Sequence, residues 1–328
     1  MKYVGLDVHK LYIHGTVLDE NGKVLKRGRF EYTRDGFEEF FDGIEDAKVA
    51  MEAGYCWQPA YELLEDMGHE VKLAHPLKTR LIAEVKIKTD AKASDALAQL
   101  LMMGWLPTSY VPPEEIRRLR ELVRLREYLV YERTKFKNKV HAALMREGIR
   151  GRRGIFAKKR REFLNELEID EVNRCLSVID VLDRQINEIS ALIRKIAGES
   201  QEAKWLMSIP GVGYFSAVAI LAEIGDISRF PDAEKLCAYA GLVPSTHESG
   251  EISVRGRITH QGSPILRWVL VQCVWSHLCH ASDTGLTRFF YSVARKRGRH
   301  KAAVATARKM LKVMYVLLKE KREFRDFY

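Results

Sequence analysis

Residues 2–33, KYVGLDVHKLYIHGTVLDENGKVLKRGRFEYT, decide the fold at the start of the chain. They contain three β-rich runs, and the second and third are separated by DENG (19–22), where Gly22 can adopt the positive φ of a hairpin turn. Strands that follow one another through short turns pair antiparallel. We therefore expect the chain to begin with a three-stranded antiparallel meander.

The segments after this meander alternate between strand and helix. Strands are expected over KVAMEA (48–53) and EVKLAH (70–75), and helices over DGFEEFFDGI (35–44), over QPAYELLEDMG (58–68) and from Pro76 onward. This alternation predicts parallel additions to the sheet. Three antiparallel strands followed by such units is the order of the ribonuclease H-like (RuvC-like) fold. We predict this α/β fold over residues 1–107.

Two further parts, mainly helical, are expected after a boundary at GWLPTSYVPP (104–113), which contains three prolines. Helical periodicity over 114–147 and 159–197, with the basic turn GIRGRRG (148–154) between, predicts a helical hairpin or coiled coil in residues 108–200. Small apolar residues then become frequent. We expect a third domain over residues 201–328.

Composition predicts a globular protein that acts in the cytoplasm. No run of eighteen uncharged apolar residues occurs among the 328 residues, and Asp7 and His9 stand where a signal peptide needs an apolar core, so we expect no membrane segment. Five cysteines without a CxxC pair favour a reducing compartment. The cluster in QCVWSHLCH (272–280) lacks a second pair of ligands, so core packing is favoured over zinc binding.

The positive charge is concentrated in one stretch. The formal net charge is +10, and residues 114–161 contain 17 Lys and Arg against 6 Asp and Glu. Such a stretch is typical of binding to a phosphate backbone, whereas a solvated helix face normally interleaves acids with bases. The candidate nucleic-acid-binding residues here are Arg117, Arg118, Arg124, Lys135, Lys139, Arg150, Arg152 and Arg153.

Carboxylates at two predicted strands indicate a metal site. Asp7 lies within an apolar strand, where a carboxylate is costly unless it is solvated, paired or bound to metal, and Glu52 ends another strand. Each acid alone could equally mark an accessible strand end, but together, on strands that this fold places side by side, they favour a metal. Asp90, in the first turn of the helix KTDAKASDALAQLL (88–101), is the natural third ligand. Oxygen ligands of this kind favour Mg²⁺ in phosphodiester chemistry.

The fourth position of this site holds no acid. A residue three positions after Asp90 is rotated about 60° from it on a helix, whereas one five positions on is rotated about 140°. The first of these is Ala93 and the second is Asp95. Asp95 is therefore expected to point away from the site, and Ala93 occupies the place of a fourth ligand.

A second constellation lies in the C-terminal third. SIPGVGYFSAVAILAEI (208–224) is similar to a helix-hairpin-helix, in which Gly211 and Gly213 would allow backbone N–H groups to bind a phosphate, although a structural turn between helices has the same pattern. GLVPSTHESGEISVRGRITHQGSPILRWVLV (241–271) is expected as a loop-rich polar passage that enters an apolar helix. Ser249 is either a nucleophile or a turn former, and the basic side chains expected to hold phosphate around it are Arg255, Arg257, His260 and Arg267.

Taken in order, these motifs resemble the DEDD-type transposases of the insertion sequence 110 family, also described as bridge-RNA-guided recombinases. The resemblance rests on VGLDVHK (4–10), AMEAGYCW (50–57), KTD (88–90), GWLPTSYVPP (104–113), IPGVG (209–213), AYAGLVPS (238–245) and GRITHQGSPILRW (256–268). It implies a RuvC-like domain whose metal acids are Asp7, Glu52 and Asp90, a coiled-coil region, and a transposase domain with the catalytic serine Ser249.

The same resemblance implies the reaction and the partners. Family members cut donor and target DNA through a serine–phosphate intermediate, at a composite site of two protomers. Mg²⁺, a structured noncoding bridge RNA and a homodimer or homotetramer are also implied. The family pattern has an Asp where this chain has Ala93. This departure suggests a weakened metal site in a protein that binds nucleic acid but recombines poorly.

Two other functions remain open from the residues. In a RuvC-like junction resolvase or nuclease, water would attack the phosphate and Ser249 would be structural. In a non-catalytic nucleic-acid-binding scaffold, the loss of an acid at Ala93 would have no consequence.

Overall fold

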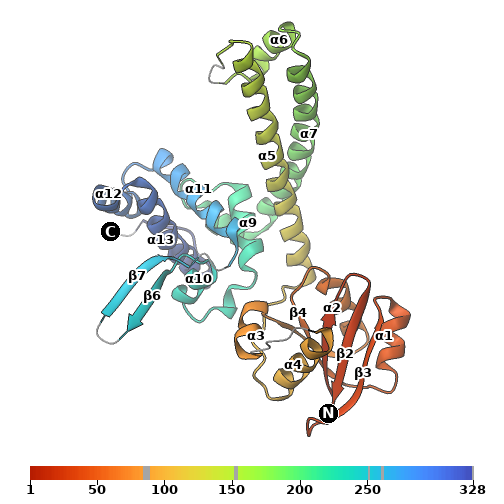
Figure 1. Cartoon of the computed structure of the whole chain (residues 1–328). Coiled ribbons are helices and arrows are strands. Elements are labelled where there is room, and N and C mark those ends of the chain that lie inside the picture. Colours follow the sequence, from red (N-terminus) through yellow and green to blue (C-terminus); the bar gives the residue numbers. More distant parts are fainter. Residues whose placement is uncertain (84–88, 151–153, 250–251, 260–261, 327–328) are drawn as a thin grey trace. The chain divides into compact units, whose positions relative to one another are not determined.

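The computed structural model describes residues 1–83, 89–150, 154–249, 252–259 and 262–326. The chain forms two compact units, Met1–Val111 and Pro112–Tyr328 (Figure 1).

The first unit is a mixed five-stranded sheet flanked by helices (Figure 1). Its strands are β1 (Tyr3–Val8), β2 (Tyr12–Leu18), β3 (Val24–Glu31), β4 (Lys48–Glu52) and β5 (Glu70–Ala74), and its helices are α1 (Arg34–Phe41), α2 (Trp57–Asp66), α3 (Pro76–Ala83) and α4 (Asp90–Met102). The strand order is β3-β2-β1-β4-β5. β1, β2 and β3 pair antiparallel, and β4 and β5 are added parallel. The expected meander with parallel additions is confirmed.

Strand alternation divides the sheet into two different faces. Val4, Leu6 and Met51 point to one face, where they form a core with side chains such as Phe37 of α1 and Leu64 of α2. The opposite face carries Gly5 and Asp7, and it is covered by α4. This second face positions the candidate metal ligands.

Gly5 lets α4 lie directly on the sheet. A Cβ atom at Gly5 would lie 2.0 Å from the Ser94 carbonyl oxygen and 2.5 Å from the Ala98 backbone nitrogen. Thr89 caps the helix by accepting a hydrogen bond from the Lys92 N–H. The first helical residue is Asp90, so the close contact with β1 brings its carboxylate toward the end of that strand.

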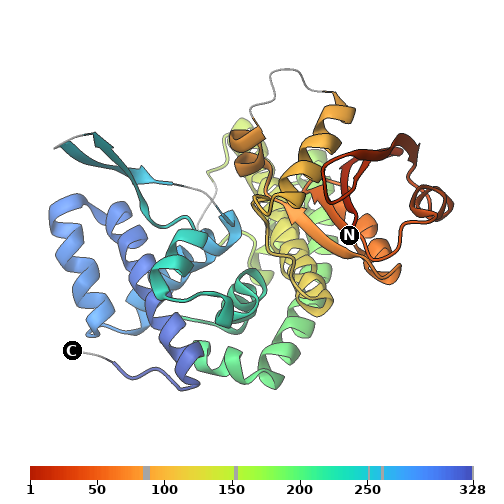
Figure 2. The same cartoon turned by 90° about the horizontal axis from the view of Figure 1, so that it is seen from below.

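The second unit is helical apart from a β-hairpin (Figures 1 and 2). Its elements are α5 (Glu114–Arg146), α6 (Lys158–Glu166), α7 (Asp170–Glu199), α8 (Gln201–Met207), α9 (Tyr214–Ile224), the 3₁₀ helix η1 (Ile227–Arg229), α10 (Ala233–Tyr239), β6 (Pro244–Ser249), β7 (Ile252–Ile258), α11 (Pro264–His280), α12 (Gly285–Arg297) and α13 (Arg299–Glu320).

The two long helices α5 and α7 run antiparallel beside each other (Figure 1). Arg133 of α5 pairs with Asp183 at 2.6 Å, and Arg126, two turns earlier, donates to Ser190 at 2.9 Å. The helix expected over 159–197 is interrupted, because Glu168 has a φ of +48° between α6 and α7. One hydrophobic core joins these helices to the C-terminal part: Val123 of α5 and Ile193 of α7 pack with residues such as Val218 of α9.

The passage expected as a polar loop after Gly241 is a β-hairpin. β6 and β7 pair antiparallel, with Ser249 opposite Ile252, and extend away from the helices of this unit (Figure 2). Ile252, Val254 and Ile258 alternate along β7 and favour a strand, although two arginines and a glycine between them mask the pattern.

Among the described residues, no helix combines the length and apolarity needed to cross a bilayer.

Candidate metal centre

Three side chains with metal-ligand atoms meet where β1 ends under α4. Asp7 comes from β1, His9 from the turn after it and Asp90 from the first turn of α4. One ligand atom from each lies within 4.8 Å of the others. His9 Nε2 lies 3.4 Å from Asp7 Oδ2 and 3.5 Å from Asp90 Oδ2. The sequence prediction that Asp7 and Asp90 come together agrees with this geometry.

Burial makes the Asp7 carboxylate electrostatically unfavourable without a cation. Desolvation raises the pKa of Asp7 above its usual value, and the nearby negative charge of Asp90 raises it further, while His9 opposes the shift. Two carboxylates facing each other supply the oxygen ligands that a hard divalent cation prefers. The donor set therefore fits such a cation, with the His9 imidazole beside it as a third available group.

Tyr12 fixes the Asp90 side of this cluster. Its hydroxyl donates a hydrogen bond to Asp90 Oδ2 at 3.1 Å, and its ring stacks on His9 with centroids 4.7 Å apart. The hydrogen bond to Asp90 is the main reason that the pKa of Tyr12 is raised. The Arg29 guanidinium also lies over the Tyr12 ring, with Cζ 3.7 Å from the ring centroid.

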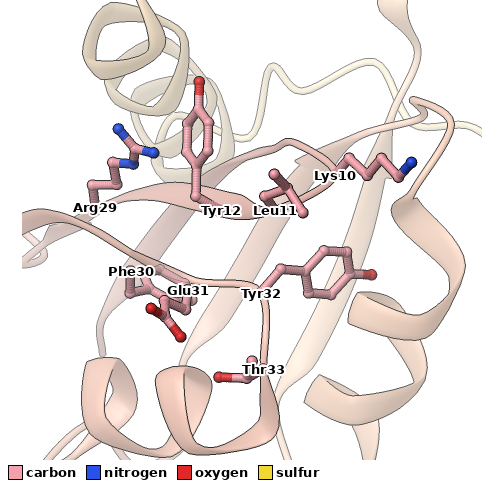
Figure 3. Close-up of a pocket in the computed structure, with 8 residues that line it drawn as sticks. All are labelled: Lys10, Leu11, Tyr12, Arg29, Phe30, Glu31, Tyr32 and Thr33. Atoms are coloured by element: carbon pink, nitrogen blue, oxygen red, sulfur yellow. The ribbon is translucent and has the colours of Figure 1, made fainter.

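Tyr12 and Arg29 also line a shallow cavity of about 670 Å³ next to the cluster. Figure 3 shows their side chains standing side by side on one side of the sheet, with Lys10 and Leu11 on the turn beyond them. The remaining lining residues are Phe30, Glu31, Tyr32 and Thr33.

Glu52 lies at the neighbouring strand end but outside the close group. β1 and β4 pair in parallel up to Leu6 and Met51, so Asp7 and Glu52 occupy the next position on each strand. Within the described part of the chain, the group of close ligand atoms does not include Glu52. Its carboxylate instead lies 3.8 Å from Arg80 of α3.

Asp95 is held away from the cluster, as its position on the helix predicts. It accepts a hydrogen bond from Thr16 at 2.7 Å and forms an ion pair with Arg27 at 2.6 Å. Ser94 beside it bonds both Thr16 and His14. These contacts dock α4 onto β2 and β3. Ala93, one turn after Asp90, offers only a methyl group.

The predicted second constellation is described in part. Ser249 is the last residue of β6, and the β7 backbone carries Arg255 and Arg257; His260 lies outside the described residues. Arg267 donates to the carbonyl groups of Ala240 and Gly262, both at 3.2 Å. The guanidinium of Arg267, predicted to hold phosphate, thus bonds backbone carbonyl groups of the protein.

The two glycines of IPGVG have different surroundings. Gly211 has a φ of +90°, and a Cβ atom there would lie 2.3 Å from the backbone nitrogen of His277 in α11. The His277 ring bonds the Pro210 carbonyl and the Thr284 hydroxyl, both at 2.7 Å. Gly211 therefore packs this turn against α11, and Gly213 is exposed at the start of α9. Consistent with core packing, Cys273 in the same helix is buried, and burial raises its pKa to about 11.

Several predicted nucleic-acid-binding residues already have protein partners. Arg124 forms a bidentate pair with the buried Glu223 at 2.9 and 3.0 Å. Arg117 donates to the Pro112 carbonyl at 2.8 Å, Arg118 pairs with Glu114, and Lys135 pairs with Glu132 at 2.8 Å. Lys139 and Arg150 are exposed, and Arg152 and Arg153 lie outside the described residues.

Sequence reasoning missed His9, Tyr12 and Arg29 as members of this site. His9 carried a signal, because it stands two residues after Asp7 and so on the same side of an extended chain. Tyr12 and Arg29 carried none, since their approach to Asp90 depends on how α4 lies over the sheet.

Comparison with known proteins identifies the family. A DEDD transposase model of the IS110 type, described as "Transposase", matches residues 4–147, and a model described as "Transposase IS116/IS110/IS902 family" matches residues 203–291. The chain is 26% identical to the transposase for insertion sequence element IS1111A of Coxiella burnetii, over 99% of this chain and 92% of that protein. It is 26% identical to the transposase for insertion sequence element IS1328 of Yersinia enterocolitica, over 96% of both, and 28% identical to a probable family 20 transposase of Pseudomonas aeruginosa, over 98% of both. The order of the matched segments, the mixed sheet and the paired carboxylates agree, and the chain belongs to the IS110 family of insertion-sequence transposases.

Proposed function

We propose that this transposase cuts and rejoins DNA through a serine–phosphate intermediate, with Asp7, Glu52 and Asp90 as metal ligands and Ser249 as the nucleophile. The observation that carries the proposal is the meeting of Asp7 and Asp90 in the segment matched by the DEDD transposase model. The assignment of Glu52 rests on its place beside Asp7 at the strand ends. To bind the metal, the Glu52 carboxylate would have to leave Arg80 and turn toward the metal ion.

The proposed cation is Mg²⁺, because the donors are carboxylate oxygens. When bound, Mg²⁺ would neutralise charge on the scissile phosphate and favour ionisation of the attacking hydroxyl. The residues of the chain hold the site in place: Tyr12 orients Asp90, and the contact between Gly5 and α4 sets the distance from Asp90 to β1.

The proposed step conserves the phosphate ester. Ser249 Oγ forms a bond to phosphorus and loses its proton to a base or water, while the bond from phosphorus to one sugar oxygen breaks and that oxygen is protonated. A sugar hydroxyl of another strand then attacks the same phosphorus and releases the serine. Because an ester bond persists throughout, rejoining needs no external energy source.

We propose three domains with different roles: residues 1–107 hold the metal, residues 108–200 form the coiled coil, and residues 201–328 supply the serine. A composite site, to which one protomer of a dimer or tetramer supplies the metal ligands and another supplies Ser249, is part of the proposal because the resemblance to the family implies it. A structured bridge RNA that pairs with donor and target DNA is proposed as the guide. Sequencing of RNA that copurifies with the chain would test it, and absence of any enriched structured RNA would count against it.

The serine is tested by trapping a covalent adduct between the protein and a nicked DNA substrate. The chain and a Ser245→Ala control, altered on the same strand, are expected to form the adduct, and Ser249→Ala is expected to form none. If Ser249→Ala cuts DNA as well as the unaltered chain, water is the nucleophile and the protein acts as a RuvC-like nuclease.

Ala93 favours a second candidate, a scaffold that binds nucleic acid without cutting it. We propose that Ala93 replaces the fourth acid and weakens the metal site. Ala93→Asp is then expected to increase strand exchange, and Asp95→Ala is expected to leave the metal requirement unchanged. The substitution hypothesis fails if the unaltered chain is fully active and Asp95→Ala abolishes that activity. If Ala93→Asp neither binds Mg²⁺ nor cuts DNA, the scaffold function gains support.

A further inference from the structure

The turn that joins α12 to α13 (Figure 1) gathers several exposed positive side chains. Residues 295–301, RKRGRHK, are all exposed. No ion pair joins Arg295, Lys296, Arg297, Arg299 or Lys301 to any other described residue. We call these five side chains the basic turn.

The surroundings of the basic turn contain almost no negative charge. From Thr284 to Lys319 there is no Asp or Glu, and α11, the helix beside this hairpin, also has none. Further along α13, Arg308 and Lys312 pair with Glu234 of α10. Glu234 therefore compensates two cations in the middle of α13 and none of the basic turn.

Two of the five cations of the basic turn stand where the helix dipole disfavours them. Arg295, Lys296 and Arg297 end α12, where positive charge suits the helix dipole. Arg299 and Lys301 begin the 22-residue helix α13, which has no acid in its first turn and no side-chain cap. Positive charge at a helix start is unfavourable.

An aromatic side chain orients this surface. The Arg299 guanidinium carbon lies 5.8 Å from the ring centroid of Trp275 in α11, and the His300 ring centroid lies 6.5 Å from it. Arg299 is thereby held against a half-buried ring while the neighbouring cations face solvent. This arrangement presents several cations together at the end of one helical hairpin.

The stretch 114–161 contains more positive charge than the basic turn, but many of its cations form ion pairs within the protein. In 114–161, ion pairs to acids engage Arg118, Arg124, Arg133, Lys135, Arg146 and Arg161. Net charge along the sequence therefore overstates the free charge of that stretch. The basic turn is shorter, but its five cations are free of acids.

We infer that the basic turn binds the phosphate backbone of duplex DNA, as a contact surface separate from the metal centre and from the stretch 114–161. Exposed cations without acids release counterions when they neutralise phosphates. DNA is chosen because the family acts on it, so the inference rests on that part of the proposed function. Binding here would position DNA without reading its sequence.

The test compares two triple variants of the full chain. The turn variant carries Arg295→Gln, Arg299→Gln and Lys301→Gln. The control variant removes three exposed cations elsewhere in the same unit: Arg184→Gln, Lys204→Gln and Lys235→Gln. Thermal unfolding of both checks that the fold persists. Binding to labelled duplex DNA, and to an RNA hairpin of equal length, is measured by fluorescence anisotropy in EDTA over a range of salt concentrations.

The turn variant is expected to bind duplex DNA about tenfold more weakly or worse, and its plot of log affinity against log salt should be shallower by about 2–3. The control variant should keep the slope of the unaltered chain. An unchanged slope in the turn variant, a loss confined to RNA, or no DNA binding by the unaltered chain would overturn the inference. Because EDTA prevents metal-dependent cutting, failure of the serine or metal chemistry would leave this result intact.

Discussion

Asp7 is a carboxylate in a strand whose other side is fully apolar, with Val4 and Leu6 completely buried. Its own side chain is 20% exposed. Burial and the charge of Asp90 both raise its pKa. Such a position costs stability and is retained where a ligand uses the charge. The sequence was sufficient to single out Asp7, because an acid interrupts an otherwise apolar run.

Removal of the Asp7 charge should stabilise the metal-free protein. Because the pKa of Asp7 is raised in the folded state, the folded chain binds this proton more tightly than the unfolded chain does. Protonation of Asp7 therefore stabilises the folded state at low pH, and this stabilisation is lost as pH rises from the usual value of 3.8 through the raised pKa. Asp7→Asn is therefore expected to unfold at a higher temperature at pH 7 in EDTA; about 4 °C would correspond to roughly 1 kcal/mol in a domain of about 100 residues. The unaltered chain should lose stability as pH rises through this range, while Asp7→Asn should lose less.

The control is Asp66→Asn, which removes an exposed acid at the end of α2. Its melting temperature should match that of the unaltered chain at each pH. A lower melting temperature for Asp7→Asn than for Asp66→Asn at pH 7 in EDTA would contradict the account of Asp7 as an unfavourable buried charge.

At the scale of elements, the site depends on how α4 lies on β1. Strand and helix periodicity predicted both elements, and Thr89 and Asp90 marked the helix start. The side chains that bind the helix to the sheet, Ser94 and Asp95 with Thr16, could not be predicted, because they meet across 78 or more residues of sequence. The β6–β7 hairpin was missed for a similar reason, since local polarity outweighed a weak alternation.

Gly5→Ala should separate α4 from the sheet. Its Cβ would lie 2.0 Å from a backbone oxygen that cannot turn aside. We expect a loss of about 1–3 kcal/mol in the free energy of unfolding, measured in urea, and a fall in DNA cutting because Asp90 moves. Gly28→Ala on β3 is the matched control, since nothing lies within 4 Å of its added Cβ. Equal stability of the two variants would show that α4 is not held in this way.

At the scale of the whole molecule, the sequence gives the number and position of the charged residues, but it does not show which of them form ion pairs. The excess in 114–161 was evident, yet Arg124 pairs with Glu223, 99 residues away. Arg120 donates to the Ala222 and Glu223 carbonyls at the end of the same helix. These arginines stabilise the core that joins α5 to α9. Whether a cation is free depends on tertiary contacts, which charge counts omit.

Arg124→Gln should destabilise the second unit, because it leaves the Glu223 carboxylate, only 1% exposed, without its partner. We expect a loss at the lower end of about 3–5 kcal/mol, since Arg124 itself is half-exposed. Lys139→Gln, at an exposed position of the same helix, should change stability by less than about 0.5 kcal/mol. Chemical denaturation measures both, and a small effect of Arg124→Gln would refute the structural role.

The central claim is that the cluster of Asp7 and Asp90 holds a divalent cation for DNA cutting. It is tested most directly by titrating Mg²⁺ calorimetrically into the unaltered chain, Asp90→Asn and Asp95→Asn. The two variants make the same change five residues apart on α4, but only Asp90 faces Asp7 and His9. The account predicts that Asp90→Asn loses Mg²⁺ binding and that Asp95→Asn keeps it. Loss of binding in Asp95→Asn with retention in Asp90→Asn would contradict it.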